Sequence, residues 1–135
     1  MATLTLCKSP NVLSMTTLQE LRSNLKSLEL NPEVDALVIT STAGSNTFCA
    51  GLDLQEFHKP DPARLRAYWK EVQESMIELY GTRLATVAKL NGHTVAGGCI
   101  VALVADYRVM LAPPEGKAPF RIGLNEAALG MTLPW

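Results

Sequence analysis

A run of four apolar residues at positions 36–39 (Ala-Leu-Val-Ile) constrains the fold more than any other segment of the chain. Its length and β-branched content are typical of a strand buried on both faces, the kind found in parallel sheets. Parallel strands require a long crossover between them, and this crossover is usually a helix. Helical patterns lie on both sides of the run, so the sequence predicts an α/β protein with a parallel sheet.

Two amphipathic helices are expected, one before and one after this strand. The first has leucines at spacings of three, four and three from Leu18, and a capping box of Thr17 and Glu20, or of the residues one position earlier. The second begins at Asp61, an N-cap residue followed by proline, and ends at Gly81. Its expected buried stripe consists of Leu65, Trp69, Val72, Met76 and Leu79.

The remaining segments continue the alternation of strands and helices. Strands are expected at residues 3–7, 85–90, 107–112 and 120–124, a small-residue helix from Gly97 to about Ala105, and a short helix near Asn125. Residues 48–54 fit no regular period. No linker or repeat divides the chain, so residues 1–135 are expected to form one domain.

Charge and cysteine content exclude several classes of function. Lys and Arg number 12 against 13 Asp and Glu, so the net charge of -1 gives no basic excess for nucleic-acid binding. The apolar runs are too short to span a bilayer, and the first ten residues show no targeting signal. Three cysteines without a CxxC pair favour reduced thiols, with Cys49 and Cys99 as small buried hydrophobes. His58 and His93 lack metal-ligand spacing, so we expect no metal site and a structural role for His93.

Three segments are candidates for chemistry, each with a simpler alternative. Gly97 and Gly98 open a helix whose free N–H groups suit an oxyanion or a phosphate, but two glycines also allow close packing on a strand. Residues 50–53 (Ala-Gly-Leu-Asp) would present N–H groups to a ligand or form a plain turn. Glu126 lies in an apolar setting, where desolvation strengthens a carboxylate as a base, or it is a first-turn residue favoured by the helix dipole.

Four segments in order resemble the crotonase (enoyl-CoA hydratase/isomerase) superfamily, and within it the mitochondrial-type delta(3),delta(2)-enoyl-CoA isomerases. They are residues 48–54 (Phe-Cys-Ala-Gly-Leu-Asp-Leu), 91–99 (Asn-Gly-His-Thr-Val-Ala-Gly-Gly-Cys), 105–108 (Ala-Asp-Tyr-Arg) and 122–130 (Ile-Gly-Leu-Asn-Glu-Ala-Ala-Leu-Gly). The resemblance implies an α/β crotonase-like ββα superhelix. It also implies an acyl-CoA thioester substrate with no separate cofactor, since coenzyme A is part of the substrate.

The resemblance assigns roles to individual residues. The backbone N–H groups of Leu52 and Gly97 correspond to the oxyanion hole that holds the thioester carbonyl, and Glu126 corresponds to the isomerase base. The coenzyme A site would comprise Ala50, Gly51, Leu52, Asp53, Leu54, Gly97 and Gly98. The local density of basic residues, and not the resemblance, suggests Lys59, Arg64 or Arg66 as contacts for the phosphates. Hydratases of the family carry a second glutamate where this chain has Ile100. An isoleucine cannot orient water, so isomerisation is favoured over hydration.

Members of this family are about twice as long, and their C-terminal helices cover the acyl pocket and build a trimer. We therefore expect residues 1–135 to be the N-terminal core portion of an incomplete domain, with the C-terminal helical part and a first strand missing. The resemblance implies isomerisation of 3-enoyl-CoA in the oxidation of unsaturated fatty acids, in the mitochondrial matrix or in the peroxisome, by a homotrimer. The alternatives are a non-catalytic chain that binds coenzyme A or assembles with longer subunits, and an enoyl-CoA hydratase.

Overall fold

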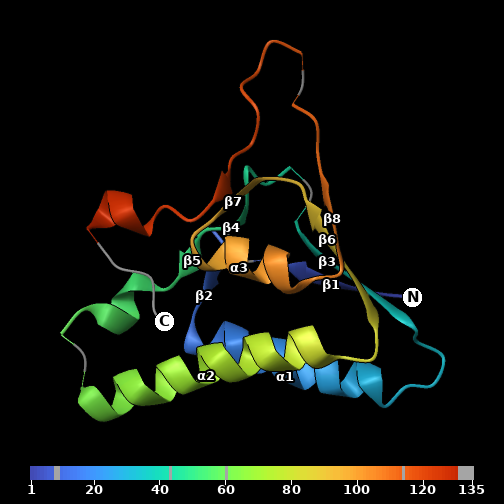
Figure 1. The fold of residues 1–135 in the computed structure, drawn as a ribbon, viewed down its shortest axis with the longest axis horizontal. Coiled ribbons are helices and arrows are strands. Elements are labelled where there is room, and N and C mark those ends of the chain that lie inside the picture. The colour runs from blue at the N-terminus through green and yellow to red at the C-terminus, as the bar shows by residue number, and fades with distance from the viewer. Residues whose placement is uncertain (8–9, 43, 60, 114, 131–135) are drawn as a thin grey trace.

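The computed structural model describes residues 1–7, 10–42, 44–59, 61–113 and 115–130. It confirms the α/β class (Figure 1). The helices are α1 (Met15–Glu29), α2 (Pro62–Gly81) and α3 (Gly97–Val104), with the 3₁₀ turns η1 (Leu54–Phe57) and η2 (Glu126–Leu129). The strands are β1 (Ala2–Leu6), β2 (Val12–Leu13), β3 (Ala36–Ser41), β4 (Thr47–Cys49), β5 (Gly51–Leu52), β6 (Ala85–Leu90), β7 (His93–Val95), β8 (Tyr107–Met110) and β9 (Ile122–Gly123).

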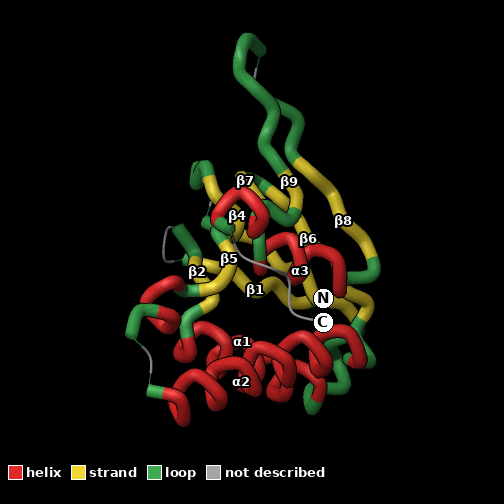
Figure 2. The backbone as a smooth tube through the Cα atoms, turned by 60° about the vertical axis from the view of Figure 1, so that its left-hand side comes forward, coloured by secondary structure: helices red, strands yellow, loops and turns green. Residues whose placement is uncertain are grey.

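The strands form three parallel sheets. The largest has the order β1-β3-β6-β8, and the smaller ones are β2-β5 and β4-β7-β9. Helices α1 and α2 lie side by side as one layer, and α3 lies between that layer and the strands (Figures 1 and 2). The chain after β8 extends as a long arm away from the body and returns into β9 (Figure 2).

The predicted central strand is β3, which pairs in parallel with β1 on one side and β6 on the other. Only one of its faces is fully buried, however. Leu37 and Ile39 point into the core, whereas Ala36 and Val38 are partly exposed. The expectation of burial on both faces was therefore wrong for the second face, because the helices α1 and α2 form a layer on one side only (Figure 2).

Helix α1 begins earlier than predicted. Its N-cap is Ser14, whose hydroxyl accepts the N–H of Thr17 at 3.2 Å, so the expected capping box at Thr17 and Glu20 was wrong. The leucine stripe was correct, since Leu18, Leu21 and Leu25 are buried. Helix α2 begins at the predicted Asp61 cap, but its fully buried residues include Tyr68, and the predicted Trp69 is only partly buried.

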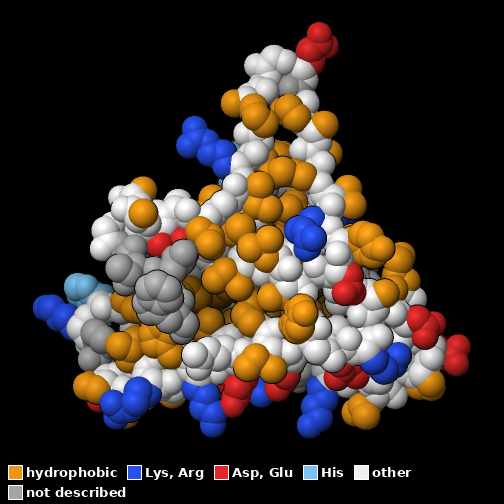
Figure 3. All heavy atoms as spheres, viewed as in Figure 1, with side chains coloured by type: hydrophobic (Ala, Val, Ile, Leu, Met, Phe, Trp, Pro, Cys, Tyr) orange, Lys and Arg blue, Asp and Glu red, His pale blue; other side chains and the backbone are white. Residues whose placement is uncertain are grey.

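Several large apolar side chains of α3, β8 and β9 are exposed. Figure 3 shows apolar side chains gathered across the centre of the molecule and along the base of the arm. Six large apolar side chains from this part of the described chain have more than two fifths of their area exposed, and we call them the apolar surface: Leu103, Tyr107, Val109, Leu111, Ile122 and Leu124. Large exposed apolar surfaces are typical of interaction sites or ligand-binding grooves. Within the described residues, no helix has both the length and the hydropathy needed to cross a membrane.

Candidate functional site

Two backbone segments that are far apart in the sequence meet at the start of α3. Gly51 in β5 has φ +98°, and a Cβ atom there would lie 2.7 Å from the Cβ of Ala96 and 2.9 Å from the nitrogen of Gly97. Both distances are shorter than real Cβ contacts, so only glycine allows this approach. The requirement for glycine at position 51 therefore comes from the contact between β5 and α3.

The residue before Gly97 has an unusual backbone conformation. Ala96 is the N-cap of α3 with φ 50° and ψ -129°, a conformation that costs free energy in any residue with a side chain. Its carbonyl oxygen accepts the N–H groups of Cys99 and Ile100. The Gly97 N–H, at the first position of the helix, donates to no backbone oxygen within the described part of the chain.

The two predicted oxyanion-hole residues lie next to each other. A Cβ atom on Gly97 would lie 3.2 Å from the nitrogen of Leu52 and 3.3 Å from side-chain atoms of Leu13 and Leu52, so the glycine allows these segments to pack closely. The two residues are 45 positions apart in the sequence. The fold therefore brings the Leu52 and Gly97 amides together, as the sequence interpretation requires, although their role in binding an oxyanion stays a prediction.

Glu126 lies at the start of η2, on the wall of the same site. A cavity of about 270 Å³ is lined by Val12, Ala50, Leu52, Asp53, Leu54, Gln55, Phe57, Ala96, Asn125 and Glu126. The Oε2 atom of Glu126 is buried and has no hydrogen-bond partner among the described residues. Burial and the charge of Glu126 both raise the pKa of the neighbouring Cys99 thiol. An unpartnered carboxylate oxygen beside a mostly apolar cavity is available to accept a proton.

Four of the seven predicted coenzyme A residues line this cavity, namely Ala50, Leu52, Asp53 and Leu54, whereas Gly51, Gly97 and Gly98 are not among its lining residues. A Cβ atom on Gly98 would lie 2.4 Å from the carbonyl oxygen of Cys49 in β4, because the backbone of α3 packs directly on that strand. Close packing therefore accounts for Gly98, and a ligand contact at Gly97 stays a prediction.

Gly98→Ala should therefore destabilise the chain by about 1–3 kcal/mol, since the new methyl group overlaps backbone that cannot move away cheaply. Urea denaturation measures this change. The matched control is Gly81→Ala at the end of α2, where an added Cβ meets nothing within 4 Å and the helix gains stability. Equal stability of the Gly98 and Gly81 variants would contradict the packing explanation.

Of the basic residues suggested for phosphate binding, one forms an ion pair within the protein and two are exposed. Arg64 forms a two-point ion pair with the buried Glu56, with Nε and Nη2 each about 3 Å from a carboxylate oxygen. The pair ties η1 to the start of α2. Lys59 and Arg66 are exposed. Arg64 is therefore already engaged, and Lys59 and Arg66 stay predictions for a phosphate contact.

His93 has structural contacts, and Cys49 and Cys99 are buried, as the sequence predicts. His93 accepts the N–H of Arg121 through Nδ1 at 3.0 Å and packs edge-to-face on Phe120, which is a structural role. Cys49 is buried, and desolvation raises the pKa of its thiol to about 11. Among the residues that the structure describes, His, Cys, Asp and Glu side chains form no cluster suited to a metal ion.

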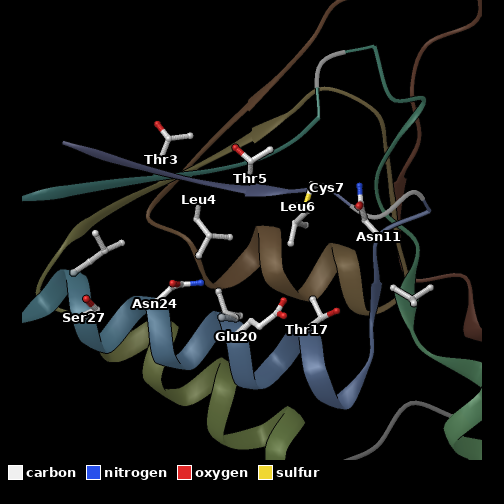
Figure 4. Close-up of a pocket in the computed structure, with 13 residues that line it drawn as sticks. Thr3, Leu4, Thr5, Leu6, Cys7, Asn11, Thr17, Glu20, Asn24 and Ser27 are labelled. Atoms are coloured by element: carbon white, nitrogen blue, oxygen red, sulfur yellow. The ribbon is translucent and has the colours of Figure 1, made fainter.

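A second hollow, of about 330 Å³, lies between β1 and α1 (Figure 4). Leu4 and Leu6 point down from β1 toward the helix, whose Thr17, Glu20 and Asn24 face the opening. None of the predicted site residues lines this hollow. The candidate site is therefore the smaller cavity, where the predicted residues converge.

Sequence reasoning missed six residues of the site. The cavity is also lined by Val12, Gln55, Phe57, Ala96 and Asn125, and Tyr68 bonds through its hydroxyl to the backbone beside Leu52. A signal existed only for Tyr68, which lies four positions before the predicted buried residue Val72 and hence on the same helix face.

Comparison with known proteins decides the family. The model for "Enoyl-CoA hydratase/isomerase" matches residues 1–134. The chain belongs to the enoyl-CoA hydratase/isomerase family. The mitochondrial enoyl-CoA delta isomerase 1 of Mus musculus is 40% identical over 125 residues, which are 93% of this chain and 42% of that protein. The Homo sapiens protein is 41% identical, with coverage of 93% and 40%.

Solved structures of the enoyl-CoA hydratase/isomerase family confirm the crotonase fold. The crystal structure of human mitochondrial delta3-delta2-enoyl-CoA isomerase matches with a TM-score of 0.86 and 40% identity, over 94% of this chain and 48% of that one. An enoyl-CoA hydratase structure from Geobacillus kaustophilus, at 24% identity and a TM-score of 0.82, supports the fold alone. The chain spans less than half the length of the isomerases that it matches.

Proposed function

We propose that this chain carries the catalytic residues of a delta(3)-delta(2)-enoyl-CoA isomerase, which converts 3-enoyl-CoA to 2-trans-enoyl-CoA. The observation that carries the proposal is the buried Oε2 of Glu126, which has no hydrogen-bond partner in the described part of the chain and lies in a cavity that Leu52 also lines. The identity of about 40% to proteins named as enoyl-CoA delta isomerases supports the choice of reaction.

In the proposed mechanism Glu126 removes a proton from C2 of the substrate, and the electrons of that C–H bond move into a dienolate. Negative charge develops on the thioester oxygen, which the N–H groups of Leu52 and Gly97 stabilise by about 3 kcal/mol each. The protonated Glu126 then returns the proton to C4. The C3=C4 double bond is replaced by C2=C3, and no water, metal or external electron acceptor is consumed.

Ile100 supports isomerisation over hydration. It lies in the first half of α3 and is partly buried. Its side chain has no group that could bind or activate a water molecule. Hydration would add water across the double bond of a 2-enoyl thioester. Without a second glutamate, the Glu126 carboxylate alone would have to activate the water molecule and transfer the proton.

The test is an assay of the purified chain with a 3-enoyl-CoA, in which the absorbance of the conjugated 2-enoyl thioester reports turnover. We expect an increase in this absorbance. A folded chain that shows no increase would overturn the proposal for this chain. Formation of 3-hydroxyacyl-CoA from 2-enoyl-CoA would point instead to a hydratase.

The exposed apolar surface on α3, β8 and β9 favours a second candidate function, a non-catalytic chain that binds coenzyme A or assembles with longer subunits. This surface is available for contact with further protein, and the chain spans less than half of its relatives' length. Light scattering of the chain, alone and mixed with a full-length relative, tests assembly. Binding without turnover would favour the second candidate.

We also propose a mitochondrial matrix location, with the peroxisome as the alternative, and a homotrimer for the full-length protein. The location follows the names of the relatives, which are mitochondrial isomerases. Cell fractionation followed by immunoblotting with antibody against the chain tests the location. Light scattering of the native full-length protein tests the trimer.

A further inference from the structure

The hydroxyl of Tyr68 connects two backbone segments beside the candidate oxyanion hole. Tyr68 belongs to α2, and its side chain has no exposed area. The hydroxyl accepts the N–H of Asp53 at 3.2 Å and donates to the carbonyl oxygen of Leu13 at 2.6 Å. One oxygen atom therefore joins α2, the end of β2 and the residue that follows Leu52.

The position of this hydroxyl extends the pairing between β2 and β5. The two strands pair in parallel, and their last partners are Leu13 and Leu52. The Tyr68 hydroxyl lies between the Leu13 carbonyl and the Asp53 N–H and hydrogen-bonds to both, so it holds the two strands together at their last pair.

This contact also constrains the backbone at Leu52. The Asp53 N–H belongs to the peptide group that follows Leu52, so its hydrogen bond to Tyr68 holds that peptide group and limits rotation at Leu52. The Leu52 nitrogen lies 3.2 Å from the Cβ position of Gly97. Tyr68 therefore holds the backbone at the point where β5 meets the start of α3.

We propose that Tyr68 is a positioning residue, which aims the Leu52 N–H at the thioester oxygen by holding the Asp53 N–H. The proposal rests on the proposed isomerase function, and Tyr68 itself does not touch the substrate. Its ring is held by Phe57, which lines the cavity and packs edge-to-face on Tyr68 with 5.8 Å between ring centroids. Burial raises the pKa of Tyr68 to about 12, so the hydroxyl keeps its proton and remains a donor to Leu13.

Loss of this contact should affect the transition state more than substrate binding. The Leu52 N–H is needed most when charge develops on the thioester oxygen, and misdirection weakens that interaction. Substrate binding also uses the other residues that line the cavity, so it depends less on this one amide. Tyr68→Phe should therefore lower kcat about 10-fold and leave KM within about 2-fold, which is the pattern of an interaction made in the transition state.

The first experiment compares the steady-state kinetics of two variants of the full chain, Tyr68→Phe and Tyr80→Phe, with 3-enoyl-CoA as the substrate. Tyr80 lies in the same helix and is 77% exposed, so its variant controls for loss of a tyrosine hydroxyl from α2. Tyr68→4-aminophenylalanine restores a donor to Leu13 but only a poor acceptor for the Asp53 N–H, so its kcat should stay close to that of Tyr68→Phe. If the wild-type protein is active and Tyr68→Phe has the same kcat, the inference about Tyr68 is wrong. If the wild-type protein is inactive, the proposed isomerase function is wrong instead.

The second experiment needs neither activity nor a variant that folds. Amide hydrogen exchange of the wild-type chain, followed by NMR, should show the Asp53 N–H exchanging at least about 10-fold more slowly than amides of exposed loops, because it donates to the buried Tyr68 hydroxyl. An unprotected Asp53 N–H would overturn the inference. Where Tyr68→Phe folds, the protection of Asp53 should be lost and that of the β3 amides retained.

Discussion

Glu126→Gln should lower isomerase turnover by at least about 1,000-fold, since one carboxylate is proposed to carry out both proton transfers. Glutamine has nearly the same shape, but its amide has no basic oxygen that could take a proton from C2. The cavity and the candidate oxyanion hole are left unchanged by the substitution. The kcat with 3-enoyl-CoA measures the loss, and calorimetric titration with a saturated acyl-CoA should give a Kd within about 3-fold of wild type.

The matched control is Glu33→Gln. Glu33 is an exposed glutamate outside the cavity, so its variant should retain the wild-type kcat. Glu126→Asp provides a further comparison, because its carboxylate is shorter by one methylene and should retain part of the activity. If Glu126→Gln retained turnover, the base would have to be another residue, and the proposal for Glu126 would be wrong.

The sequence predicted the regular elements best where the local signals were strong. Asp61 followed by proline marked the start of α2, and the apolar run at residues 36–39 marked β3. The predicted start of α1 was wrong because Thr16 and Thr17 carry the same kind of capping hydroxyl as Ser14. Only the structure shows which hydroxyl accepts the free N–H.

The smaller sheets could not be predicted from periodicity. Strands β4, β5 and β7 contain only two or three residues each, fewer than a period-two pattern needs. They are defined by pairing with distant strands, such as Thr47 with His93. Conformation at Gly51 and Ala96 likewise depends on their mutual contact, which no local pattern encodes.

The candidate site was predictable as a set of residues but not as an arrangement. Leu52, Gly97 and Glu126 were identified from the family resemblance, and the structure places Leu52 beside Gly97 and on a shared cavity wall with Glu126. Tyr68 was missed because its proposed positioning role depends on hydrogen bonds to two distant backbone groups, the Leu13 carbonyl and the Asp53 N–H. A hydrogen bond from a buried hydroxyl to distant backbone leaves no periodic signal in the sequence.

Gly51→Ala should reduce turnover by at least about 100-fold, comparable to the loss of one oxyanion-hole donor. The new methyl group would lie 2.7 Å from the Cβ of Ala96 and 2.9 Å from the nitrogen of Gly97, so β5 and α3 must move apart. This movement separates the Leu52 and Gly97 amides. The variant should also lose about 2–4 kcal/mol of stability, from the positive φ together with overpacking.

Gly44→Ala is the control that separates the cost of the positive φ from the cost of overpacking. Gly44 also has positive φ, +80°, but an added Cβ there meets nothing within 4 Å. It should therefore show only the conformational cost, about 1–2 kcal/mol in urea denaturation, with wild-type kcat. If both variants lost the same stability and Gly51→Ala kept its turnover, close approach of β5 to α3 would not be required for the reaction. A selective loss of kcat in Gly51→Ala, at temperatures where both variants are folded, would instead tie the contact between these backbones to catalysis.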